Sequence, residues 1–220
     1  MPRYFLEFLN LQKDEPDSLL VTLKLFHKNL PNTTEKIAQL FEDNDLKLSY
    51  RKTLVTRIIA PEYLVQFGSP VRRSKKETNL IDFREFKNLD ITFEKKLLGR
   101  TGLVCAAEKP GIPTMELCIL FVPWGKYEEL EGYVVIGECK EWCQLRDWLV
   151  NIDVAKQGES WEIPTGDGVW INRCGILEDP IKKAKKSNTR VDTETIVEVK
   201  RPAEGKVRAV DLLFKKRKRI

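Results

Sequence analysis

The side chains that most often bind metals or act as nucleophiles are few in this chain of 220 residues. His27 is the only histidine, and Cys139 and Cys143 are spaced for one face of a helix rather than for a zinc knuckle. We therefore expect no metal site and no cofactor. An odd number of cysteines, most of them in apolar stretches, predicts buried reduced thiols, with disulfides as the alternative. The cysteines are Cys105, Cys118, Cys139, Cys143 and Cys174.

Basic side chains cluster in two runs within residues 179–220. This basic tail contains 14 Lys and Arg against 6 Asp and Glu, whereas residues 1–178 contain 24 against 27. The runs favour nuclear localisation, so we expect the chain in the nucleus or in both nucleus and cytoplasm. RNA or DNA contact through the tail is less favoured, because aromatic residues do not interleave with the charges; a merely solubilising tail is the third interpretation. The runs consist of Lys182, Lys183, Lys185, Lys186, Lys215, Lys216, Arg217, Lys218 and Arg219.

Composition predicts one packed domain over residues 1–178, followed by the flexible basic tail over residues 179–220. Apolar residues make up 42% of the chain, which is enough for a sizeable core. No apolar stretch is long enough to predict a membrane span, and the first residues lack the features of a signal peptide. Within the tail, residues 195–199 and 209–214 could order on a protein partner or pack back on the domain.

Alternating apolar residues predict a domain made mainly of short strands. Pro31 is expected to open a helix that is capped by a threonine, because apolar residues follow it at helical spacing. A second helix is expected over residues 138–151, and residues 70–98 as an irregular surface segment. This pattern predicts a small antiparallel barrel covered by two helices. The strands are expected at 3–9, 19–26, 54–59, 63–67, 102–107, 115–122, 133–137 and 169–174.

Several of these segments resemble the cyclophilin family, in the family's order and spacing. Residues 56–59, T-R-I-I, are similar to the family's H-R-I-I, and residues 63–68 resemble its F-M-x-Q-G-G. Residues 133–137 resemble H-V-V-F-G, and residues 169–175 resemble the closing strand, I-x-I-x-x-C-G. The resemblance covers residues 3–178. It implies an eight-stranded antiparallel β-barrel capped by two α-helices and filled with side chains, so that ligands bind in an outer groove.

The same resemblance implies which residues would form the site. Cyclophilins accelerate rotation about X–Pro bonds, whose barrier is ~18–20 kcal/mol. Arg57 matches the family's arginine, and an arginine suits this work because its charge is permanent and its donors are rigidly placed. Arg57 and Gln66 would thus be catalytic if the chain is active. The implied peptide-binding positions are Tyr63, Leu64, Ala107, Glu108, Glu116, Cys118, Leu130 and Tyr133.

Several of these positions depart from the family pattern. Cys118 replaces the aromatic residue of the pocket floor, Tyr133 replaces a histidine, and the W-L-D-G run reads E-L-E-G around Leu130. Lost aromatic surface weakens the hold on a proline ring at ~25 cal/mol per Å². Glu108 and Glu116 replace neutral amides and could pair with Arg57, although solvated charges at the rim are an alternative interpretation.

Together these changes predict a cyclophilin-like protein–protein interaction module with degraded or absent prolyl isomerase activity. It would bind a segment of a larger nuclear protein complex. The first alternative is a weakly active peptidyl-prolyl cis-trans isomerase. The second is a nucleic-acid-associated factor whose tail makes the contact.

Overall fold

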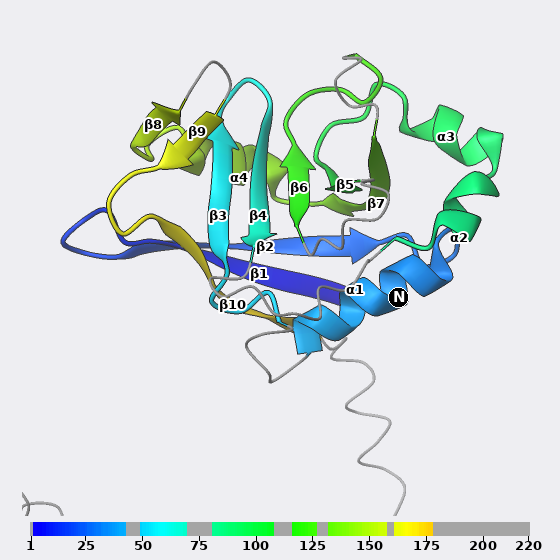
Figure 1. Cartoon of the computed structure of the whole chain (residues 1–220), viewed down its shortest axis with the longest axis horizontal. Helices are drawn as coiled ribbons and strands as arrows, with labels where there is room; N and C mark the ends of the chain where they lie inside the picture. Colours follow the sequence, from blue (N-terminus) through cyan, green and yellow to red (C-terminus); the bar gives the residue numbers. More distant parts are fainter. Residues whose placement is uncertain are drawn as a thin grey trace, which may run out of the picture.

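The first and last strands of the domain lie side by side and close a β-barrel (Figure 1). The computed structural model describes residues 2–42, 49–69, 81–107, 116–126, 132–157 and 161–177. Strand β1 (Arg3–Asn10) pairs with β2 (Asp17–Leu25) on one side and with β10 (Val169–Leu177) on the other. The strand order is β1-β10-β3-β4-β6-β5-β7-β2, and the pairs are antiparallel. The predicted eight-stranded antiparallel barrel is confirmed.

The other five strands of the barrel lie close to their expected positions. They are β3 (Leu54–Ile59), β4 (Leu64–Ser69), β5 (Leu103–Ala107), β6 (Leu117–Leu120) and β7 (Tyr133–Cys139).

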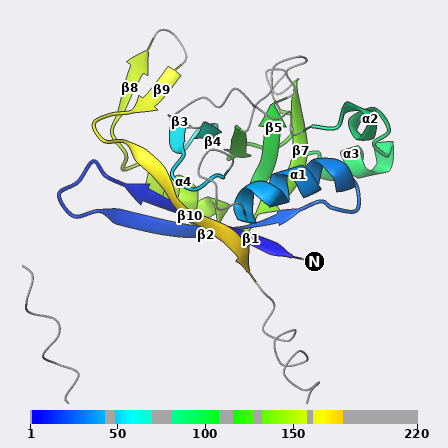
Figure 2. The ribbon, with the colours of Figure 1, turned by 60° about the horizontal axis from the view of Figure 1, so that its bottom comes forward.

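One hairpin was not predicted. It consists of β8 (Val154–Gln157) and β9 (Trp161–Pro164), and β9 lies near β3. Figure 2 shows this hairpin at the opposite end of the molecule from helices α2 and α3.

Alternation along the strands separates an inner face of the barrel from an outer face. In β4, Val65 and Phe67 belong to the main core, whereas Leu64 belongs to a second apolar cluster. In β6, Ile119 points into the main core and Cys118 does not. Since successive side chains of a strand point to opposite faces, every other residue of these strands is left outside the barrel.

The interior of the barrel is filled by aromatic rings in contact with one another. Phe8 meets Phe67 edge-on at 5.5 Å between ring centroids, and Tyr50 meets Phe67 at 6.3 Å. Phe41 contacts both Tyr50 and Tyr4, at 5.1 and 5.0 Å. Edge-to-face pairs of this kind add to the free energy gained by burial. The interior of the barrel is therefore filled with side chains, as the resemblance implied.

Helices α1 (Pro31–Glu42) and α4 (Trp142–Leu149) are the two that the sequence predicted. Both add buried side chains to the main core, among them Ile37 and Phe41 from α1 and Leu145 and Leu149 from α4. Helix α4 is shorter than the expected 138–151, because β7 continues to Cys139 and uses those residues as strand.

The interpretation of residues 70–98 as irregular is wrong for its second half. Helices α2 (Phe83–Lys87) and α3 (Ile91–Leu97) lie there, while residues 70–80 are outside the described residues. Asp90 caps α3 by accepting a hydrogen bond from the backbone N–H of Thr92 at 2.9 Å. None of the described helices combines the length and apolarity that a membrane crossing requires.

Candidate functional site

Four side chains form a row across the outer face of the barrel. Arg57 on β3 is paired with Gln66 on β4, and Gln66 with Cys118 on β6. Cys118 is in turn paired with Cys105 on β5. Residues directly opposite each other in antiparallel strands lie on the same face, so the strand register alone brings these groups together. We call them the outer row; three of them are predicted site residues.

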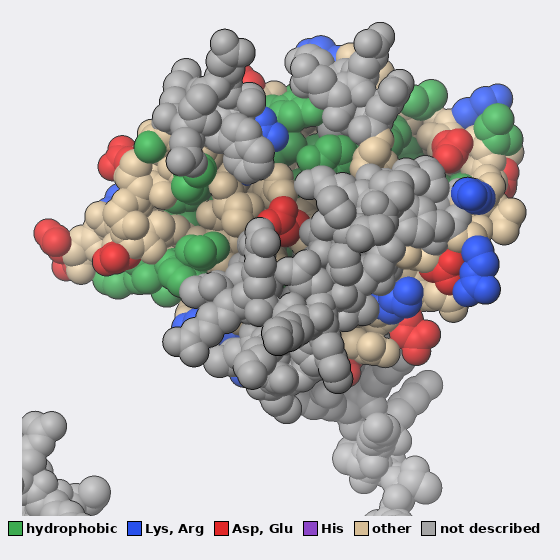
Figure 3. Space-filling model, viewed as in Figure 1, with side chains coloured by type: hydrophobic (Ala, Val, Ile, Leu, Met, Phe, Trp, Pro, Cys, Tyr) green, Lys and Arg blue, Asp and Glu red, His purple; other side chains and the backbone are tan. Residues whose placement is uncertain are grey.

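An apolar cluster surrounds the outer row. In Figure 3, hydrophobic side chains are visible over the upper ends of β5, β6 and β7 and beside α3. Leu64 and Cys118 lie at the base of this cluster with exposed fractions of 0% and 1%, so both are closed off from solvent. Partly buried rings pack against the cluster, and we call the whole the outer cluster. Its rings are Phe26, Tyr63, Phe93, Trp124 and Tyr133.

Tyr133, the first residue of β7, packs partly buried against the outer cluster. Burial raises the pKa of Tyr133 to about 12, with Cys118 and Tyr63 acting in the same direction and the Arg57 guanidinium in the opposite one. Its ring packs against the cluster that contains Cys118, although β5 separates the strands of these two residues in the sheet. With its pKa raised, the phenol is protonated near neutral pH.

The carboxylate of Glu116 is hydrogen-bonded to Gln66, at the polar end of the outer row. The side-chain amide of Gln66 donates a hydrogen bond to Glu116, which immediately precedes β6. The Thr56 hydroxyl donates a hydrogen bond to the backbone carbonyl of Gln66 at 3.4 Å. Glu116 thus places negative charge beside Gln66, and β4 lies between β6 and the β3 strand of Arg57, whose side chain is half-buried.

The other predicted site residues are placed as follows. Tyr63 lies in the turn between β3 and β4, and its carbonyl accepts a hydrogen bond from the backbone N–H of Phe121 at 2.8 Å. Ala107 ends β5, opposite Tyr133. Glu108, Leu130 and the nine basic residues of the tail lie outside the described residues.

The thiols of the site are buried and reduced. Cys105 and Cys118 face each other across β5 and β6, and no cysteine of the described chain forms a disulfide. Burial raises the pKa of Cys105 well above its usual range, and Cys118 adds to the shift. The Cys105 thiol therefore stays protonated and unreactive. The prediction of free thiols is confirmed, with Cys143 as the exposed exception.

Within the described ranges, no group of His, Cys, Asp and Glu side chains could hold a metal ion.

Helix α3 contributes to the site and was missed in the sequence. Phe93 and Leu97 pack on the outer cluster, and Phe93 meets Phe26 edge-on at 5.4 Å. The sequence does contain a pattern typical of a short helix here. Asp90 precedes the run and Gly99 follows it, and the apolar residues Phe93 and Leu97 lie four positions apart between them.

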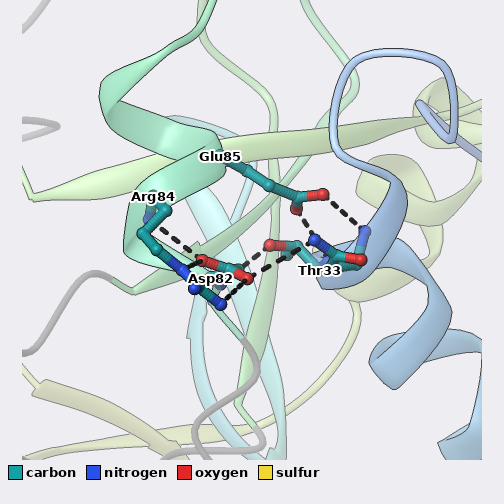
Figure 4. A network of polar contacts seen from close by, with 5 residues as sticks. Thr33, Asp82, Arg84 and Glu85 are labelled. Atoms are coloured by element: carbon teal, nitrogen blue, oxygen red, sulfur yellow. Dashed lines mark hydrogen bonds and ion pairs between the residues drawn. The ribbon is translucent and has the colours of Figure 1, made fainter.

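The segment that carries α3 is fixed to α1 through α2 (Figure 4). Glu85 accepts hydrogen bonds from the backbone N–H groups of Asn32 and Thr33 at 2.6 and 2.9 Å, which satisfies the first turn of α1. The backbone N–H of Asp82 donates to the Thr33 hydroxyl at 2.9 Å. A glutamate more than fifty residues away thus replaces the threonine cap that the sequence suggested.

Comparison with known proteins agrees with this architecture. The family model described as cyclophilin type peptidyl-prolyl cis-trans isomerase/CLD matches residues 12–176. No curated protein matches the chain. The matched range contains the outer row, Tyr133 and nearly the whole barrel, with β1 preceding it. The chain therefore belongs to the cyclophilin-type peptidyl-prolyl cis-trans isomerase family.

Proposed function

We propose that this chain is a nuclear cyclophilin-like interaction module that binds an extended segment of a larger protein and has little or no prolyl isomerase activity. The observation that carries the proposal is the position of Tyr133. Its partly buried ring packs against the apolar cluster that contains Leu64 and Cys118, and these two side chains have no surface left for a proline ring.

The electrostatics of the outer row support the same conclusion. Lowering the barrier to rotation needs donors aimed at the twisted peptide group. Gln66 instead donates its side-chain amide to Glu116, which adds negative charge beside the outer row. Such a site would hold a polypeptide at its rim, with a preference for basic residues near Glu116, better than it would twist a proline bond.

A weakly active isomerase is the second candidate, and a specific observation favours it. Arg57 and Gln66 remain directly opposite each other on one face, which is the part of the family's site that a catalyst would need to keep. The two candidates therefore differ in whether the chain accelerates proline rotation at all.

The test is the rate of cis–trans exchange in a short Ala-Pro-Phe peptide, measured by exchange NMR with catalytic amounts of the full chain. We expect a rate within about twofold of the uncatalysed one, and no change with Arg57→Ala. Arg84→Ala is the matched control, because Arg84 is highly exposed and lies on α2. Acceleration that Arg57→Ala removes and Arg84→Ala keeps would decide for the isomerase.

A further inference from the structure

A cavity of about 340 Å³ opens between α3 and the outer face of β7. This volume is at the small end of ligand pockets, which suits one or two side chains better than a whole cofactor. We call it the α3 cavity. Its apolar walls include Phe93, Leu97, Leu98, Trp124, Tyr133 and Val135.

Two strongly exposed aliphatic side chains line the α3 cavity. Ile91 is 62% exposed and Leu98 is 59% exposed. In the described part of the chain, Leu20 and Val150 are the other large hydrophobic residues exposed to a similar degree, and neither lines this cavity. Apolar surface concentrated beside an apolar hollow favours a bound apolar group, which would remove both from water.

The α3 cavity continues into the candidate site. Leu97, Trp124 and Tyr133 line the cavity and also belong to the outer cluster, which contains Cys118 of the outer row. A polypeptide held against the outer row would therefore lie beside the cavity. Continuity of this kind distinguishes the cavity from an isolated hollow on the surface.

The walls of the α3 cavity are already fixed in place. The backbone N–H of Trp124 donates to the Arg100 carbonyl at 2.9 Å, and the Trp124 carbonyl accepts from Gly99 at 3.0 Å. On the helix side, Leu97 is buried and anchors α3 to the outer cluster. A preformed pocket binds at a low entropic cost.

We propose that the α3 cavity takes a bulky apolar side chain, such as Leu, Met or Phe, from the same polypeptide that lies along the outer row. This inference rests on the proposed function, because it assigns the partner's second anchor. The charged residues that line the cavity are Glu94 and Lys95, one of each sign, so its charge selects neither an acidic nor a basic group. Selection comes from apolar fit.

The test uses the full chain labelled with ¹⁵N and a set of acetylated Gly-Ser-Lys-Pro peptides, in which each flanking position in turn carries Leu, Phe or Ala. The Gln66 side-chain amide reports on the outer row, and the Trp124 indole reports on the cavity. We expect the best Leu or Phe peptide to shift both signals and to bind about tenfold more tightly than its Ala counterpart, a difference of 1.4 kcal/mol. Leu98→Gln should abolish that difference, whereas Val150→Gln, an equally exposed site elsewhere, should keep it.

Each other result has a definite meaning. Peptides that shift Gln66 equally well with Leu, Phe or Ala would overturn the α3 cavity inference and leave the proposed function standing. Peptides that shift neither signal would overturn both. If replacing Leu212 and Phe214 of the tail by Ser shifts the Trp124 indole without any peptide, the occupant is the chain's own tail, and the assignment to a foreign peptide is wrong.

Discussion

Residues 118 and 133 changed in opposite directions relative to the cyclophilin pattern. Where the resemblance implied an aromatic residue, the chain has the small Cys118, and where it implied a histidine, the chain has the larger Tyr133. In the structure the partly buried Tyr133 ring packs against the apolar cluster that contains Cys118. A large ring packed beside a small residue keeps contacts that an empty hollow would forfeit.

This arrangement predicts which thiols react in the native protein. In a Cys143→Ser background the remaining described thiols are buried, so Ellman's reagent should react slowly. Tyr133→Ala should uncover Cys118 and raise the rate of its reaction by about tenfold or more. The measurement is the rate of thiol modification, with the modified site located by peptide mass spectrometry.

Tyr133→Phe is the control for that experiment. It keeps the ring and removes only the hydroxyl, so Cys118 should stay protected. Equal reactivity of Cys118 in the Phe and Ala variants would mean that the ring does not cover the thiol.

Among the elements, the start of β5 depends on a glycine. Gly102 has φ +70°, and a Cβ at this position would come within 2.3 Å of the Trp142 ring. Gly102→Ala should therefore destabilise the fold by roughly 2–4 kcal/mol, combining the left-handed backbone cost with displacement of the indole. Urea unfolding measures the loss.

Gly99 offers a matched comparison. It has φ +74° but nothing within 4 Å of the added Cβ. Gly99→Ala should thus cost only the backbone part, about 1–2 kcal/mol. Equal losses for the two variants would show that the contact with Trp142 contributes nothing.

The pairing of β1 with β10 contains a buried carboxylate whose charge stabilises the barrel. Arg173 donates to Glu7 at 2.7 and 2.8 Å, and Asn172 adds a bond at 2.7 Å. These bonds, led by that of Arg173, hold the pKa of Glu7 below its usual range despite its burial. A lowered pKa means that the stabilisation is present above the usual pKa of a glutamate and is lost as the pH falls through the lowered value.

Glu7→Gln should therefore lower the free energy of unfolding at about pH 7, and its difference from the parent should shrink toward about pH 3. Glu15→Gln, in the exposed β1–β2 turn, is the control and should leave the pH profile unchanged. A constant difference between Glu7→Gln and the parent at all pH values would contradict a role for the Glu7 charge.

Strand alternation was enough to predict the barrel elements, and their register then brought Arg57, Gln66 and Cys118 together. Three features could not be obtained in this way. The α1 cap comes from Glu85, more than fifty residues away, and no local pattern encodes such a partner. The β8–β9 hairpin has strands of only four residues, too short for a clear period. The packing of the Tyr133 ring against the outer cluster depends on other strands, which spacing along one strand does not specify.

For the whole molecule, the difference in charge between the domain and the basic tail predicts where the chain goes in a cell. Replacing the basic residues of both tail runs by Gln should abolish nuclear accumulation of a fluorescent fusion, while each run alone should have a partial effect. Lys13 and Lys28, exposed lysines of the barrel domain, are the control positions. Unchanged nuclear accumulation after both replacements would exclude the tail as the nuclear localisation signal.

The same variants test the nucleic-acid alternative. If the tail binds RNA, retention on an RNA column should weaken steeply with salt and disappear when both runs are replaced. Retention that persists without the runs would assign RNA binding to the domain.

Because β1 is held between β2 and β10, its second neighbour is made about 160 residues after it during synthesis. Until β10 emerges from the ribosome, the growing protein carries unsatisfied strand edges at β1 and β3 that invite association with other chains. Chaperone contact at these two edges, ending when Val169–Leu177 docks, is the expected state of the nascent domain.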